Sequence, residues 1–127
     1  MGLWAAQTFT AAFLAVLFLQ SGLDKLFDYE GNEAWLKQHF SQSLLGGSVP
    51  LLLKTITVVE LAAGSFSLLG AIWLFFGGGD RLAGIGAFFA ALAILMLFTG
   101  QRLAKDYAGA AVLVPYFLLT LVGLYLF

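Results

Sequence analysis

The residue whose type and position most suggest chemistry is Glu60, a carboxylic acid inside a long apolar segment. If that segment is a helix beginning near Pro50, a rise of about 1.5 Å per residue places Glu60 roughly 15 Å deep. This depth is close to the middle of a hydrocarbon core about 30 Å thick. Because a charge there is unfavourable, we expect Glu60 to be protonated, paired with a cation, or directed into a wet cavity.

The residues around Glu60 form a polar stripe along the predicted helix. Lys54, Thr57, Glu60, Gly64 and Ser67 follow one another at intervals of three or four, which places them on one face. The other positions are mostly leucine, isoleucine, valine and phenylalanine, which suit contact with lipid. The stripe therefore predicts that Glu60 points into a helical bundle.

Other polar residues are expected to gather near Glu60. Gln20 and Asp24 are four positions apart near the end of the first apolar segment. Gln101 and Lys105, and likewise Arg102 and Asp106, are four apart after the third, and would share faces if that helix continues. With Glu60 beneath it, the predicted polar or ligand-binding cluster consists of Gln20, Asp24, Lys25, Lys54, Gln101, Arg102, Lys105, Asp106 and Tyr107.

Two roles are open for Glu60. It could brace the bundle as the structural partner of Lys54 or Arg102, or it could bind a ligand and relay a proton. No catalytic residue is assigned beyond this possible relay. The chain has no cysteine and one histidine, His39, which excludes thiol chemistry, thiolate metal sites and multi-histidine sites within this chain. No metal site is predicted, and His39 is expected to be a polar residue at the membrane interface.

The elements that must position these residues are transmembrane helices. Of 127 residues, 61% are hydrophobic and 10% are charged, whereas soluble domains average about 45–50% and 25%. Four apolar segments, at about 3–23, 49–76, 82–99 and 108–127, are long enough or nearly long enough to span a bilayer. The sequence thus predicts an all-α integral membrane protein, a single domain of residues 1–127 forming an antiparallel four-transmembrane-helix bundle. The net charge of −1 gives no reason to expect nucleic acid as a partner.

A short interfacial helix is expected between the first and second spans. Asn32 is its predicted N-cap, and Trp35 and Phe40 belong to its apolar side. The segment is expected to lie along the headgroups, with Trp35 as an anchor. Gly46-Gly47-Ser48 is expected to end it, and Pro50 suits the first turn of the next span.

An even number of spans places both termini on the same side of the membrane. The connections after the first and third spans then share the opposite side, and the positive-inside rule predicts that side to be cytoplasmic. We expect a multi-pass protein of the cell (inner) membrane. Arg81 is the basic residue on the side of the termini, and the loop side carries Lys25, Lys37, Lys54, Arg102 and Lys105.

Three segments carry a resemblance to a known family. The first span ends in SGLDKLFD (residues 21–28), the second contains ELAAG (residues 60–64), and GQRLAKDYAG (residues 100–109) follows the third. This pattern resembles the DoxX family of small four-span bacterial membrane proteins, over essentially the whole chain. The resemblance implies a quinone-linked or redox-associated role, and it singles out Lys25 and Glu60 from the shared pattern.

The favoured hypothesis is a redox-associated subunit that binds a quinone or a similar amphipathic ligand near Glu60. Arg102, Lys54, Gln101 or Tyr107 could donate hydrogen bonds to a quinone carbonyl. The electrons would come from another protein, so we expect a subunit of a quinone-linked oxidoreductase in a larger membrane complex rather than an enzyme acting alone. The alternatives are a non-catalytic accessory or assembly subunit, and a small transporter or lipid-binding protein that uses Glu60 for coupling.

Overall fold

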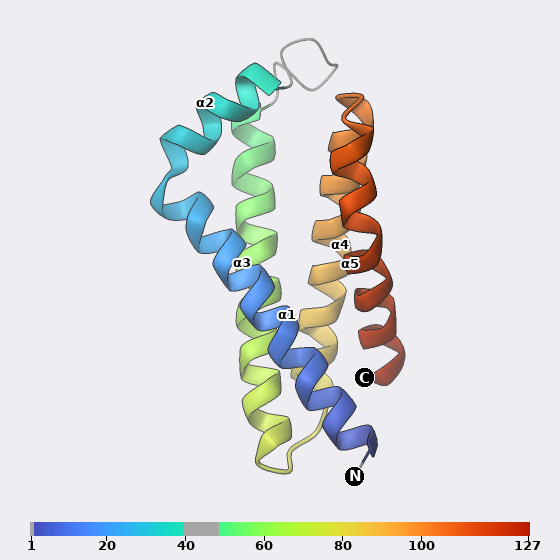
Figure 1. Cartoon of the computed structure of the whole chain (residues 1–127). Helices are drawn as coiled ribbons and strands as arrows, with labels where there is room; N and C mark the ends of the chain where they lie inside the picture. Colours follow the sequence, from blue (N-terminus) through green and yellow to red (C-terminus); the bar gives the residue numbers. More distant parts are fainter. Residues whose placement is uncertain (1, 40–48) are drawn as a thin grey trace.

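The computed structural model describes residues 2–39 and 49–127, and every regular element in these ranges is a helix. Four of the helices are long and apolar enough to cross a membrane. The predicted fold class, an all-α membrane protein built on a four-helix bundle, is therefore confirmed (Figure 1). The elements in chain order are α1 (Gly2–Phe27), α2 (Tyr29–His39), α3 (Val49–Phe75), α4 (Arg81–Leu103) and α5 (Tyr107–Leu126).

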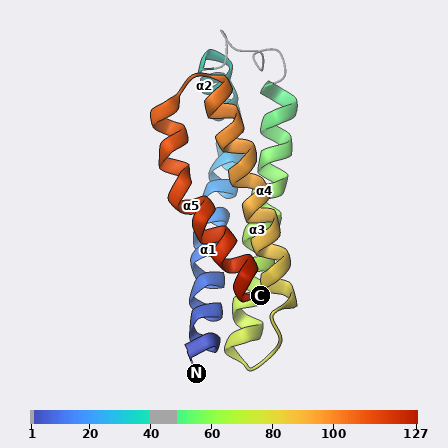
Figure 2. The ribbon, with the colours of Figure 1, turned by 90° about the vertical axis from the view of Figure 1, so that its right-hand side faces the viewer.

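The four long helices run antiparallel, and both chain ends lie at one end of the bundle, which we call the termini end (Figure 1). The opposite end carries α2 and the α4–α5 turn, and we call it the loop end (Figures 1 and 2). α3 is the central helix, since it packs extensively against both α1 and α4, while α5 packs mainly against α4. The helix that carries Glu60 thus has a closely packed neighbour on each of two sides.

Close backbone contacts join α3 to its neighbours on the termini side of Glu60. A Cβ atom added to Gly64 would lie 2.7 Å from the backbone nitrogen of Leu19 on α1, and one added to Gly86 would lie 2.7 Å from that of Ser67. Both distances are too short for a real side chain, so the helices can approach this closely only with glycine. On the termini side of Glu60, the helices are consequently packed backbone against backbone at these positions.

The connection between α1 and α2 differs from its predicted form. α1 continues four residues beyond the predicted end at residue 23, and α2 begins at Tyr29, so the predicted N-cap role of Asn32 is wrong. Asn32 lies inside α2, where its side-chain amide donates to the carbonyl of Asp28. Asp28 immediately precedes the helix, and its carboxylate lies over Gly31 in the first turn, where a negative charge is favourable. Phe40 and the predicted end of this helix at 46–48 lie outside the described residues, whereas Pro50 does occupy the first turn of α3.

The α4–α5 turn also differs, because α4 ends at Leu103. The backbone N–H of Asp106 donates to Gln101 and that of Lys105 to Arg102, while Lys105 adopts a left-handed conformation with φ 62°. This hydrogen-bond pattern closes a helix C-terminus. The expectation that the helix continues past these residues is therefore wrong. Gln101 does not share a helix face with Lys105, nor Arg102 with Asp106, because α4 ends before Lys105 and Asp106.

Candidate functional site

Glu60 is fully buried and is held by Lys25. Lys25 Nζ lies 3.1 Å from Glu60 Oε2, and the lysine side chain is 17% exposed whereas the glutamate is 0% exposed. Lys25 also donates to Ser21 Oγ, one turn earlier on α1, at 2.8 Å. The extra turn of α1 beyond residue 23 is what brings the ammonium group to the α1–α3 contact. The ion pair therefore links the first and third helices inside the bundle.

The pair leaves hydrogen-bonding capacity unused. Among the described residues, Glu60 Oε1 has no hydrogen-bond partner although it is buried. Lysine carries three N–H donors, and the contacts of Lys25 with Ser21 and Glu60 use two of them. A buried acceptor without a partner is unfavourable, so a molecule that brings a donor to Oε1 would be stabilised. The pair thus offers one acceptor and one donor side by side.

The remaining residues of the predicted cluster do not pair with Glu60. Lys54 and Arg102, considered from the sequence as its structural partners, are both exposed, and the cation that pairs with Glu60 is Lys25. The Arg102 guanidinium instead stacks on the ring of Tyr107, 4.5 Å from its centroid, at the α4–α5 turn. Exposed side chains also include those of Gln20, Asp24 and Lys105.

A second polar group forms at the loop end, between α2 and the α4–α5 turn. His39 Nε2 lies 3.2 Å from Gln101 Oε1 and 3.5 Å from Asp106 Oδ2. Asp106 Oδ1 also accepts a hydrogen bond from the backbone of Gly109, so this carboxylate caps α5 as well. Gln101 and Asp106 belonged to the predicted cluster, but the contact with His39 did not. A separation of more than sixty residues along the chain gives no sequence signal for it.

A third polar group lies on α2 itself. Lys37 Nζ is 2.9 Å from Glu33 Oε1, and the hydrogen bond from Lys37 lowers the pKa of the Glu33 carboxyl. Burial against α3, followed by the nearby charge of Glu33, raises the pKa of Tyr29. The positive charge of Lys54 also lowers the pKa of Glu33, by the smallest of these effects. Lys54 thus influences Glu33 electrostatically, whereas the cation paired with Glu60 is Lys25.

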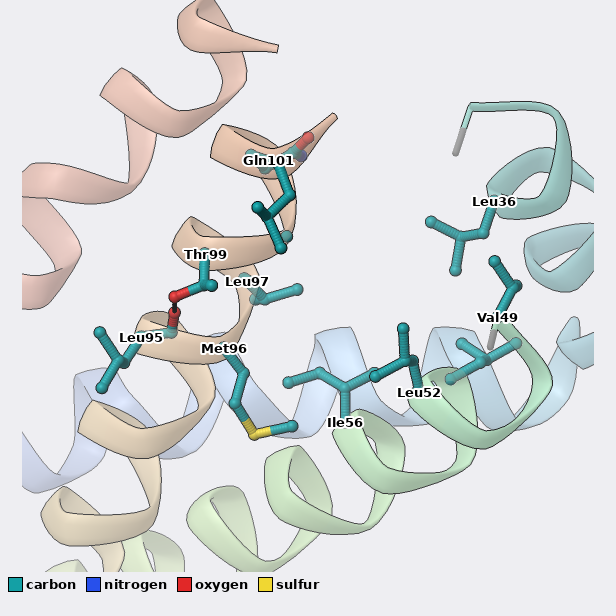
Figure 3. Close-up of a pocket in the computed structure, with 12 residues that line it drawn as sticks. Leu36, Val49, Leu52, Ile56, Leu95, Met96, Leu97, Thr99 and Gln101 are labelled. Atoms are coloured by element: carbon teal, nitrogen blue, oxygen red, sulfur yellow. Dashed lines mark hydrogen bonds between the residues drawn. The ribbon is translucent and has the colours of Figure 1, made fainter. Parts of the chain in front are cut away.

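An apolar cavity of about 420 Å³ opens between α3 and α4 at the loop end (Figure 3). Its volume lies within the range of small-molecule sites. Ile56 on α3 and Met96 on α4 extend toward each other at its deep end, and Thr99 and Gln101 supply its polar atoms (Figure 3). Among the described residues that line it, none is ionisable. The cavity therefore suits an apolar molecule or the apolar part of an amphipathic one.

Polar contacts at the termini end tie the chain ends together. Gln7, which is 9% exposed, donates to the carbonyl of Leu126 at 2.6 Å and to Asp80 Oδ2 at 3.2 Å. Trp4 Nε1 donates to the carbonyl of Leu74 at 2.7 Å. Gln7 was not among the predicted site residues, although an amide within an apolar span was the available signal. Its contacts with helix ends indicate a structural role.

The structure supports no metal centre in the parts it describes. Among residues 2–39 and 49–127, no three or more histidine, aspartate or glutamate side chains are grouped so that they could hold a metal ion.

These features define a class: a small multi-pass helical membrane protein with a lysine–glutamate pair in its core and an apolar cavity between α3 and α4 at its loop end. The family model described as DoxX matches residues 11–102, a range that contains both Lys25 and Glu60. The chain therefore belongs to the DoxX family, as its resemblance predicted. No curated protein and no solved structure matches the chain.

Proposed function

We propose that this DoxX-family protein binds a quinone or a similar amphipathic, lipid-soluble ligand at Lys25 and Glu60, as a redox-associated subunit. The observation that carries the proposal is the fully buried Glu60, whose Oε2 is held by Lys25 while Oε1 has no hydrogen-bond partner among the described residues. An ionisable group inside a membrane helix bundle marks a functional site by default. The family supports a membrane protein and is compatible with a quinone-linked role.

The chemistry of the pair matches the two states of a quinone head group. The third N–H of Lys25 would donate to a quinone carbonyl, and Glu60 Oε1 would accept from the hydroxyl of the reduced form. Reduction to the quinol takes up two electrons and two protons, one on each ring oxygen. Glu60 would relay one proton to the oxygen that lies at the pair, and the second proton would reach the other oxygen from solvent. The electrons would come from a partner redox protein in the same membrane.

One observation favours the alternative of a non-catalytic accessory subunit. The Lys25–Glu60 pair joins α1 to α3, and such a pair could serve only to hold the two helices together. The structural and ligand-binding roles predict different outcomes when both charges are removed, since packing without charges can replace a structural pair.

The test compares Glu60→Gln with the double variant Lys25→Met/Glu60→Gln in mild detergent. Retention of decylubiquinone is measured by native mass spectrometry, and stability is measured by thermal unfolding. We expect the double variant to regain most of the lost stability and still to retain no quinone, because the ammonium donor and the ionisable carboxylate are both gone. Glu30→Gln, the same change at an exposed site on α2, is the control. Recovery of both stability and retention in the double variant would show that the pair is structural.

A further inference from the structure

Glu60 lies on α3 one helical turn beyond Ile56, the last residue of that helix that lines the α3–α4 cavity. Leu53 and Ile56, which line the cavity, and Glu60 follow at intervals of three and four residues on α3, so they share one face. Glu60 is one helical turn deeper than Ile56 and is not part of the cavity lining. Ile56 and Met96 extend toward each other in the cavity lining (Figure 3), and Ile56 is the lining residue of α3 nearest to Glu60 along the chain.

We propose that the cavity holds the apolar body of the ligand, and that Ile56 and Met96 form a movable layer through which an uncharged head group reaches Glu60 and Lys25. This inference rests on the proposed function, because it assumes that the pair binds a ligand. It adds the route to the pair, the residues that control that route, and the charge state of the molecule that can take it.

The packing on either side of this layer explains why movement is confined to it. On the termini side, the glycine contacts Gly64–Leu19 and Gly86–Ser67 leave no room for even a methyl group. On the loop side, α3 and α4 are separated by the cavity. Methionine is unbranched and has three rotatable bonds, so Met96 can change rotamer without moving the helix. Displacement of Met96 is therefore the smallest change that joins the cavity to Glu60.

The lining determines the class of ligand. It is aliphatic apart from one methionine and two uncharged polar residues, and none of the described residues in it has an ionisable side chain. A carboxylate or phosphate would lose its water here without gaining a countercharge, which is strongly unfavourable. Thr99 already donates to the carbonyl of Leu95, and the Gln101 carbonyl is already in contact with His39. The ligand is accordingly a neutral lipid whose head group carries carbonyl or hydroxyl oxygens.

The experiment measures the affinity of the full chain for decylubiquinone in mild detergent, with ionised palmitate as a charged probe of similar apolar character. Ile56→Phe and Leu52→Phe each place a larger side chain in the cavity lining and so reduce the cavity volume. Ile56 is the lining residue nearest to Glu60 on α3, and Leu52 lies one turn closer to the loop end. Val58→Phe is the matched control, because Val58 is on the same helix but 67% exposed. We expect both cavity variants to weaken decylubiquinone binding by about tenfold or more, as for a misfit in an apolar pocket, and the control to leave it unchanged. Palmitate should bind weakly to all three.

The outcomes separate this inference from the proposed function. If Glu60→Gln weakens decylubiquinone binding while both cavity variants match Val58→Phe, the pair binds ligand but the cavity is not the route, and the inference is overturned. If the cavity variants weaken binding and Glu60→Gln does not, the cavity binds ligand without the pair, and both the route and the proposed function fail. If palmitate binds as tightly as decylubiquinone, the inference that the ligand is a neutral lipid is overturned. Leu52 is only half-buried, so Leu52→Phe gives the answer if Ile56→Phe does not fold.

Discussion

Replacing Lys25 with methionine should destabilise the protein more than replacing Glu60 with glutamine, because the charge left behind is in a different environment in each case. At an N–O distance of 3.1 Å, the attraction between the two charges is about 5 kcal/mol for an effective dielectric constant near 20. Desolvation opposes much of this, and breaking a buried pair typically costs about 3–5 kcal/mol. Lys25→Met leaves the carboxylate of Glu60 unpaired and 0% exposed, so its loss of stability should lie near the upper value. Glu60→Gln leaves an ammonium that is 17% exposed and bonded to Ser21, so about 2–3 kcal/mol is expected.

The assay is thermal unfolding of the wild type, both single variants and the double variant in one detergent. For a chain of this size, each kcal/mol shifts Tm by roughly 3–6 °C, so Lys25→Met should unfold at least about 10 °C early. The double variant should lie above Lys25→Met, since no uncompensated charge is left. Lys37→Met is the control: its pair with Glu33 is as short, at 2.9 Å, but exposed, and we expect little change. Additive single effects, or a larger loss for Glu60→Gln, would refute this reasoning.

Three further predictions concern packing, backbone strain and pH. Gly86→Ala should lower Tm markedly because its Cβ would lie 2.7 Å from a backbone nitrogen of α3, whereas Gly84→Ala, whose nearest contact is 3.5 Å, should be tolerated. Lys105→Gly should raise stability by about 0.5–1 kcal/mol in denaturant unfolding, because glycine adopts a positive φ without strain; no gain would mean that the strain is absent in solution. Because Lys37 lowers the pKa of Glu33 in the folded state, that contact favours folding above the ordinary carboxyl pKa and is lost as pH falls through the lowered value. Amide hydrogen exchange in α2 should then speed up at acidic pH in the wild type but much less in Glu33→Gln.

The sequence sufficed to predict the four spans because each is a long apolar run, and lipid requires the backbone of such a run to be helical. It was less informative about where the helices end. α1 continues through Asp24 and Lys25, where the apolar run has already stopped but the backbone still forms helical hydrogen bonds. α4 likewise continues four residues past the predicted end at 99. Lys105 and Asp106 then leave the helix in a closing turn that only backbone geometry reveals.

The burial of Glu60 was also predictable, because a polar stripe on an apolar helix must face the protein interior. The identity of its partner depended on which helices approach most closely and on their rotation about their axes. Both follow from the glycine contacts of α3, such as Gly64 against Leu19, rather than from the spacing of charges. Lys54 shares the stripe in sequence, yet it lies closer to the loop end and its side chain is exposed. Lys25 is on another helix and reaches the carboxylate across the α1–α3 contact.

The position of the ion pair gives the bundle two functionally different halves. On the termini side of Glu60, glycine contacts and the hydrogen bonds of Gln7 fix the helices against one another. On the loop side, α3 and α4 separate around the cavity, and α2 reaches across to α4 through the contact of His39 with Gln101. A ligand that enters from the loop side therefore needs to displace only side chains such as Met96, and the scaffold that buries Glu60 stays intact. The close glycine contacts on the termini side make that half of the bundle the fixed part of the proposed binding site, and the half around the cavity the part that we expect to adjust to a ligand.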